Sequence, residues 1–349
     1  MEKIRQNQKE YIVFLRALAT IAVVFYHSKP SISSGGYIPR YLIEVFLNWC
    51  VPIFLMISGS LFLESEKTID FKYMFKKTKH IFFIIFFWGF IYNILFVTYV
   101  ERSISLKTIV TSVVMIFKGD TTYCFQFWYL YVILGIYMFM PFFKCWTDKY
   151  LKNENINKDT YLLVCFWLVF SIIVPTILRG INIERGPLFD SFTNVISSFL
   201  FITLCGRIFD VLNYKVKRIL FLALSISFVI HALIFIYMIF VHKQENIKNW
   251  YGYETFFTLN MTSLLYMASM RINFEKIPLL IRKTYFVISK NSLFIYITHV
   301  IVLHIIRKIG FLNNVNPLIY SPLLVTITII ICLCVCYFVN KVNFLKRLF

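Results

Sequence analysis

Two ionisable side chains stand within the first long apolar segment of the sequence, where charged groups are rare. Arg16 and His27 are eleven positions apart inside the stretch 11–28. An α-helix turns about 100° per residue, so this separation is close to three full turns and places both side chains on one face, about 16 Å apart along the axis. Arginine stays charged at neutral pH, whereas histidine titrates there. One helix face would therefore carry a fixed cation and a proton acceptor.

Each of these two residues also has a simpler interpretation. Arg16 can extend to the headgroups on one side of a membrane, and His27 can lie at the interface on the other side. An ionisable group inside hydrocarbon is costly and is therefore a candidate for function. The shared helix face favours the functional interpretation over the simpler one.

The composition identifies the solvent around this helix. Of the 349 residues, 59% are hydrophobic and 15% are charged, against about 45–50% and about 25% in soluble domains. The hydrophobic residues form long blocks, many near the ~20 residues that a helix needs to cross a bilayer. We therefore expect a multi-pass protein with the lipid bilayer as its surroundings, and we place it in the plasma membrane.

The net charge of +19 does not point to nucleic acid, because the basic residues occupy short loops between apolar blocks. We expect no nucleic-acid partner. The eight Cys lie mainly in apolar blocks without paired ligand spacing, so we interpret them as small hydrophobic residues and expect no metal site.

The apolar blocks predict an all-α bundle of about ten transmembrane helices. The predicted spans are 11–28, 41–63, 80–100, 125–144, 160–178, 191–209, 218–241, 253–270, 290–308 and 318–340. The segment 104–118 is apolar but short, and we expect an interfacial or re-entrant helix there. No long hydrophilic block is present, so residues 1–349 are expected to form a single membrane domain.

The basic residues predict the orientation of this bundle. With both termini in the cytoplasm, 24 of the 36 Lys and Arg fall in cytoplasmic segments and 11 in outer segments, with Arg16 inside the membrane. Cytoplasmic loops of membrane proteins carry such an excess. No internal repeat is visible, which gives no support to the inverted-repeat plan of many transporters.

Four segments together resemble the acyltransferase-3 family of membrane acyltransferases, over nearly the whole chain. Arg16 and His27, with ten residues between them, are similar to the signature of its first helix. The other three segments, which follow in the family's order, are Val51–Phe62 with Ser58 and Gly59, Phe127–Pro141 with Trp128 and Tyr129, and Lys290–His299 with Tyr296. One departure is that many relatives carry a His just before the Trp, whereas Gln126 and Phe127 precede Trp128 here.

The resemblance implies transfer of an acyl group, usually acetyl, from cytoplasmic acetyl-CoA to a hydroxyl of a cell-surface polysaccharide or lipid-linked glycan. It makes His27 the general base or acyl relay and Arg16 a cation that positions the donor. Imidazole suits this chemistry, because an alcohol that attacks a thioester needs a proton acceptor with a pKa near ambient pH. We expect no permanently bound cofactor, and the chain looks like the stand-alone type without an appended hydrolase-like domain.

Other residues are weaker candidates for the donor or acceptor path. Ser58 could carry the acyl group, but a Ser-Gly-Ser patch with Gly59 more often allows close helix packing. Trp128 and Tyr129 could line the acceptor path, although aromatic residues are common at membrane interfaces.

A second wall of the site and a carboxylate that orients His27 are also possible. Tyr296 and His299 lie one turn apart in the ninth predicted span and could form a polar wall, or a purely structural pair. Glu44, early in the second span, could orient His27 as carboxylates orient catalytic imidazoles, or could simply lie at the interface.

Two other classes of function stay open at this stage. A polysaccharide or lipid-linked glycan exporter would share the helix count and would need no acyl donor. A non-catalytic partner in a glycan assembly complex would need neither Arg16 nor His27. The acceptor sugar, the identity of the acyl group, a covalent or direct transfer, and the oligomeric state do not follow from the sequence.

Overall fold

A computed structural model describes residues 2–29, 37–64, 68–101, 106–151, 156, 158–183, 197–241, 247–310, 312 and 315–341 of the protein. All regular elements within these ranges are helices. The α-helices are α1 (Glu2–His27), α2 (Tyr37–Phe46), α3 (Cys50–Leu63), α4 (Phe71–Glu101), α5 (Leu106–Lys118), α6 (Trp128–Tyr150), α7 (Lys158–Leu168), α8 (Val174–Gly180), α10 (Ser198–Val211), α11 (Tyr214–Phe240), α12 (Ile247–Tyr251), α13 (Phe256–Ser269), α14 (Leu279–Lys290), α15 (Ser292–Ile309) and α16 (Pro317–Val339). The short helical turns are η2 (Phe125–Phe127) and η5 (Phe274–Lys276), and the π-helical turn η3 (Val169–Ile173) joins α7 to α8.

The chain is an all-α integral membrane protein. Within the described ranges, eight helical segments are long and apolar enough to cross a bilayer: Glu10–His27, Arg40–Leu63, Phe71–Phe96, Phe125–Tyr150, Lys158–Gly180, Tyr214–Ile239, Ser292–Ile309 and Ile319–Val339. Large apolar side chains such as Ile226, Leu233 and Tyr237 on α11 are more than half exposed. A surface of that kind suits contact with lipid tails.

The other two predicted spans have a different form. The span predicted at 253–270 is the 14-residue helix α13, and the described part of 191–209 holds the 14-residue helix α10. Both helices are largely buried, and each is shorter than a straight bilayer crossing requires. The number of ten crossings and the cytoplasmic location of both termini therefore stay predictions.

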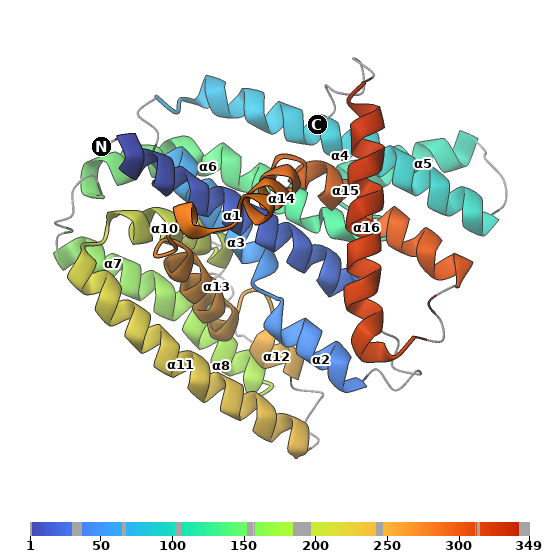
Figure 1. Ribbon diagram of the computed structural model, residues 1–349. Coiled ribbons are helices and arrows are strands. Elements are labelled where there is room, and N and C mark those ends of the chain that lie inside the picture. Colours follow the sequence, from blue (N-terminus) through green and yellow to red (C-terminus); the bar gives the residue numbers. More distant parts are fainter. Residues whose placement is uncertain are drawn as a thin grey trace.

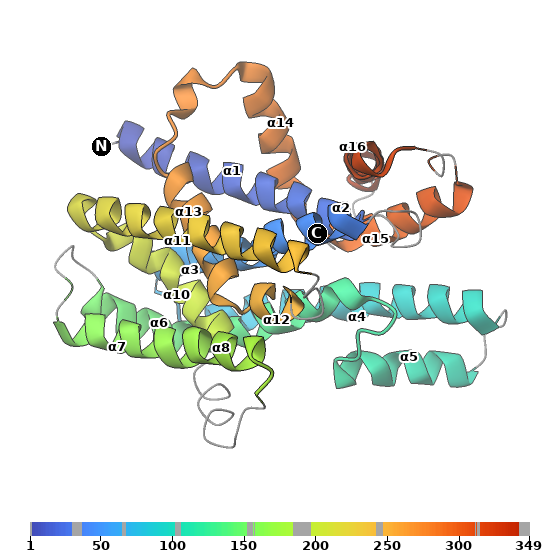
Figure 2. The same ribbon diagram turned by 90° about the horizontal axis from the view of Figure 1, so that it is seen from below.

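The segment predicted to be interfacial or re-entrant is the helix α5, which folds back along α4. Asn93 on α4 donates a side-chain hydrogen bond to the main-chain oxygen of Ser112, 3.2 Å away. The rings of Phe117 and Phe82 lie 6.0 Å apart between centroids. α4 and α5 thus form an antiparallel hairpin, as Figure 2 shows.

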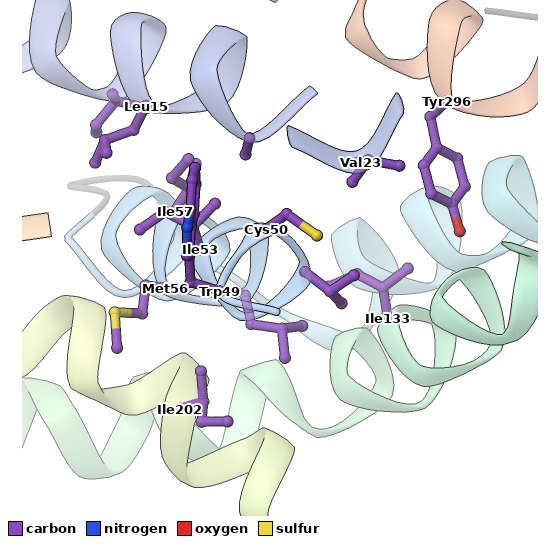
Figure 3. Close-up of a cluster of buried hydrophobic side chains, with 14 of the residues drawn as sticks. Leu15, Val23, Trp49, Cys50, Ile53, Met56, Ile57, Ile133, Ile202 and Tyr296 are labelled. Carbon is purple, nitrogen blue, oxygen red and sulfur yellow. The ribbon is translucent and has the colours of Figure 1, made fainter. Parts of the chain in front are cut away.

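Helix α3 occupies the centre of the bundle and is surrounded by α1, α6, α10 and α13. In Figure 3 the buried side chains of Ile53 and Met56 on α3, and of Trp49 just before it, point toward neighbours on other helices. Helix α16 runs across the direction of α1 in Figure 1 and is seen end-on in Figure 2. Because α3 contacts both α1 and α6, its position sets the spacing between those two helices.

Two glycines allow α3 and α10 to pack backbone against backbone. A Cβ atom on Gly59 would lie 1.7 Å from the main-chain oxygen of Thr203, and one on Gly206 would lie 2.0 Å from that of Met56. Only hydrogen fits at either position. Small residues permit such close approach between membrane helices, where lipid offers no hydrophobic force to join them.

This packing predicts a large loss of stability in Gly59→Ala. The added methyl group would force α3 and α10 apart, and overpacking of this kind costs about 1–3 kcal/mol or more. The matched control is Gly135→Ala on α6, because a Cβ there meets no atom within 4 Å. Thermal unfolding of the detergent-solubilised protein should show a lowered midpoint for Gly59→Ala alone; equal midpoints would contradict the packing account.

Candidate functional site

Helix α1 carries Arg16 and His27 toward the same neighbouring helix. Arg16 lines a pocket together with Tyr296 of α15. Eleven residues later, the ring of His27 lies against that of His299 on α15, with 5.2 Å between centroids and an interplanar angle of 35°. The aromatic rings of Phe125 and Tyr26 approach the His27 ring to 5.1 and 5.3 Å. The structure therefore brings the two histidines predicted from sequence into one pair.

The main chain fixes the protonation pattern of His299. Its Nδ1 lies 2.7 Å from the carbonyl oxygen of Tyr296 and 3.1 Å from that of Ile295. Carbonyl oxygens only accept hydrogen bonds, so Nδ1 carries the hydrogen and Nε2 carries the lone pair. This Nε2 is buried and has no hydrogen-bond partner among the described residues. The fully buried His299 thus presents a free proton acceptor beside His27.

The C-terminal end of α1 is held by contacts from α15 and α16 to its main chain. Arg307 of α15 donates hydrogen bonds to the carbonyl oxygens of His27 and Lys29, at 2.8 and 3.3 Å. Ser321 of α16 donates to the carbonyl oxygen of Ser28 at 2.9 Å. These groups replace the partners that the last carbonyls of a helix lack. His27 is therefore positioned by its backbone.

A pocket of about 310 Å³ lies toward the end of α1 that is predicted to be cytoplasmic, and we call it the inner pocket. Its polar lining comprises Arg16, Ser58, Lys77, His80, Tyr129, Tyr137, Ser292 and Tyr296. None of the carboxylates in the described part of the chain pairs with Arg16. A cation in such a pocket attracts the anionic or carbonyl group of a ligand.

Tyr296 stands between the inner pocket and the histidine pair. It lines the pocket, and its ring centroid lies 5.9 Å from that of Tyr129 and 6.1 Å from that of His299. Its hydroxyl donates a hydrogen bond to the main-chain oxygen of Gln126. The buried side-chain amide of Gln126 has no hydrogen-bond partner of ordinary geometry within the described segments. The Tyr296 ring, fixed at its tip, thus separates two polar spaces.

Ser58 and Gly59 are neighbours with different surroundings. The Ser58 hydroxyl lines the inner pocket and donates to the carbonyl oxygen of Phe54 at 2.9 Å. Its proton is therefore directed at a carbonyl, which is no base. Gly59 faces α10 instead, where its missing side chain allows the close approach described above.

Trp128 belongs to an aromatic group that reaches Tyr26, and Glu44 lies near Lys29, which follows α1 in the chain. The Trp128 ring contacts that of Tyr253 with 5.2 Å between centroids, and Tyr253 contacts Tyr26 at 5.8 Å. The Glu44 carboxylate accepts a hydrogen bond from Lys29 at 2.8 Å and forms an ion pair with Arg40 at 3.3 Å. Of the two interpretations of Glu44, a carboxylate that orients His27 or one at the interface, the structure gives neither directly: it shows these two cations as its partners.

A half-buried carboxylate that the sequence analysis did not single out joins four helices. Asp210 of α10 accepts hydrogen bonds from Ser60 at 2.5 Å, from Tyr11 at 2.9 Å and from Tyr266 at 3.0 Å. Those residues belong to α3, α1 and α13. Asp210 lies only three residues after Arg207, at the start of a basic segment that the sequence predicts to be cytoplasmic. Its position in the sequence therefore gives no sign of a structural role.

Helix α14 is tied to the start of α1 by a second polar contact. Arg282 donates to both carboxylate oxygens of Glu10, at 2.9 and 3.0 Å, and Tyr285 donates to Glu10 at 2.5 Å. Burial, followed by the hydrogen bond to Glu10, raises the pKa of Tyr285 to about 12, so the hydroxyl keeps its proton and acts as a donor. This contact anchors α1 on the N-terminal side of Arg16.

Comparison with known families shows which family this chain belongs to. Residues 9–339 match the family described as Acyltransferase domain, which is the acyltransferase-3 family. The chain belongs to this family. No curated protein and no solved structure matches it. The acyltransferase-3 assignment covers every helix that forms the inner pocket and the histidine pair, so the protein is a membrane acyltransferase.

The tautomer of His299 leads to a test by side-chain replacement. In His299→Asn the amide nitrogen can still donate to the carbonyl of Tyr296, but the acceptor at Nε2 is lost. We expect the folded yield to be kept and acyl transfer to fall by about 10²- to 10⁴-fold, the usual range for a proton-transfer group. The control is His304→Asn on the exposed face of the same helix, which should leave transfer unchanged. Equal rates in both variants would show that Nε2 has no part in the reaction.

Proposed function

We propose that this acyltransferase transfers acetyl groups from cytoplasmic acetyl-CoA to a hydroxyl of a cell-surface polysaccharide or lipid-linked glycan. The observation that supports it is the alignment of three features along α1 and α15: the inner pocket with Arg16, the Tyr296 ring, and the His27–His299 pair. A donor on one side and an acceptor on the other would meet at the histidines.

The inner pocket suits the arm of the donor. Its volume of about 310 Å³ is at the lower end for small-molecule sites, so it would hold the thioester arm while the nucleotide stays outside. Lys77 and His80 lie in the same lining as Arg16 and supply polar groups nearer the start of α4. In this proposal Arg16 orients the arm, since a guanidinium keeps its charge and offers several donors in one plane.

The histidine pair supplies proton transfer for the proposed reaction. His27 takes the proton from the acceptor hydroxyl as its oxygen attacks the thioester carbonyl; the carbon–sulfur bond then breaks, and the proton ends on the departing CoA thiol. His299 acts through His27. Its buried Nε2 makes no hydrogen bond within the described part of the chain, so it would serve as a second acceptor that receives a proton from His27.

The first test removes the proposed base. Cells that make His27→Ala at the same protein level as the wild type should lack base-labile O-acetyl esters on their surface glycan, because in this proposal His27 takes the hydroxyl proton and His299 acts only through it. Proton NMR of the glycan before and after mild base measures this. Unchanged acetylation, together with altered glycan export on deletion of the gene, would instead support an exporter.

A second test concerns the tyrosine between the two spaces. Tyr296→Ala should let water reach the bound thioester, so the ratio of free CoA released to acetyl ester formed should rise by about tenfold, since active sites limit such hydrolysis by excluding water. Tyr296→Phe keeps the ring and serves as the control, with a ratio close to wild type. Identical ratios in all three proteins would show that Tyr296 separates nothing during turnover.

A further inference from the structure

A second cavity, of about 370 Å³, lies on the far side of the histidine pair from the inner pocket, and we call it the outer pocket. Its side-chain lining includes Tyr26, Lys29, Arg40, Glu44, Asn48 and Tyr253. The Tyr26 ring lies 5.3 Å from the His27 imidazole. His27 itself does not line the cavity, so a ligand there would lie one aromatic ring away from the proposed base.

The outer pocket holds more positive than negative charge. Lys29 Nζ lies 2.8 Å and Arg40 Nε lies 3.3 Å from the same oxygen of Glu44. Glu44 is the single carboxylate among the described lining residues, and the adjoining segment 30–36 contains no Asp or Glu. Both cations thus contact one carboxylate oxygen within a partly enclosed space, where charges interact more strongly than in bulk water.

A third cation lies at the edge of the same region. The Arg307 guanidinium donates to the carbonyl oxygens of His27 and Lys29. These carbonyls accept hydrogen bonds but carry no net charge, so they do not neutralise the guanidinium. We call Lys29, Arg40 and Arg307 the outer cation cluster.

We propose that the outer pocket binds an anionic acceptor, a glycan that carries a carboxylate or a phosphate close to the hydroxyl that is acylated. This inference rests on the proposed function and narrows its substrate class. Arginine forks match carboxylate and phosphate oxygens in pairs. The rings of Tyr26 and Tyr253, 5.8 Å apart between centroids, offer the apolar surface that sugar-binding sites place beside their polar groups.

Glu44 has a defined part in this proposal. Without a ligand its carboxylate balances part of the charge of Lys29 and Arg40; an anionic acceptor competes with it for the same cations. Removal of Arg40 should therefore weaken binding of an anion, whereas neutralisation of Glu44 should strengthen it. General damage to the pocket would weaken binding in both variants, so the opposite signs separate charge selection from misfolding.

The test measures binding of defined probes to the full chain in nanodiscs of uncharged lipid. The probes are an oligosaccharide of alternating glucuronate and N-acetylglucosamine, the same oligosaccharide with its carboxylates reduced to alcohols, and a short glycerol phosphate oligomer. We expect the proposed selectivity to appear as at least about fivefold tighter binding of one anionic probe than of the reduced probe, and to vanish near 1 M salt, where charges are screened beyond about 3 Å. The anionic probe that binds identifies carboxylate or phosphate as the recognised group.

Three variants complete the test. Arg40→Gln should weaken the anionic probe by about two- to fivefold, Glu44→Gln should tighten it by a similar factor, and neither should affect the reduced probe. Lys118→Gln on α5 removes an exposed cation that is not part of the outer pocket and should change nothing. Equal binding of all three probes, no binding of any, or the same direction of change in Arg40→Gln and Glu44→Gln would overturn the proposal. Charge-selective binding in a protein that transfers no acetyl group would refute the proposed acetyl transfer and leave the anion-binding pocket standing.

Discussion

The contact between α3 and α10 is the constraint on which the remaining arrangement depends. At Gly59 and Gly206 the two helices touch through main-chain atoms, and no hydrophobic force brings helices together inside lipid. Close packing and polar contacts must do so instead. The Asp210 cluster lies beside this contact and ties α1 and α13 to the same pair of helices. With α3 fixed in the centre, α1 and α6 are held on either side of it, and the inner pocket lies where they meet α15.

Helix α15 connects the chemical parts of the site. A single 18-residue helix carries Tyr296, His299 and Arg307, so the tyrosine that bounds the inner pocket, the buried proton acceptor and the residue that caps α1 share one rigid support. Functional groups on regular helices are held more precisely than groups on loops. Movement of α15 relative to α1 would change the distances from His27 to all three groups at the same time.

The sequence predicted those features that follow from helical period and hydrophobic block length. The helical spacing placed Arg16 and His27 on one face, and the motif around Lys290–His299 indicated Tyr296 and His299 as residues of interest. Spacing alone carries no information on which carbonyls meet Nδ1 of His299, or on the pairing of Tyr11 with Asp210, 199 positions away. The sequence does contain a signal for one partner of Glu44. Arg40 stands four residues before it on α2, a separation that brings side chains together on a helix. Block length also could not distinguish α10 and α13, which are 14-residue helices with largely buried side chains, from the longer apolar helices of the bundle.

The aromatic ring of Tyr296 has a consequence for the cell as well as for the reaction. A continuous aqueous path that joined the inner pocket to the outer pocket would conduct protons and small ions down the electrochemical gradient, at about 2.3 kcal/mol per charge for each 100 mV. In the proposed reaction only a thioester arm would pass between the two pockets, and a close-fitting aromatic barrier would admit that arm while it excludes a column of water. Tyr296 and its neighbour Tyr129 would then allow the acyl group to reach the acceptor without loss of the ion gradient of the membrane.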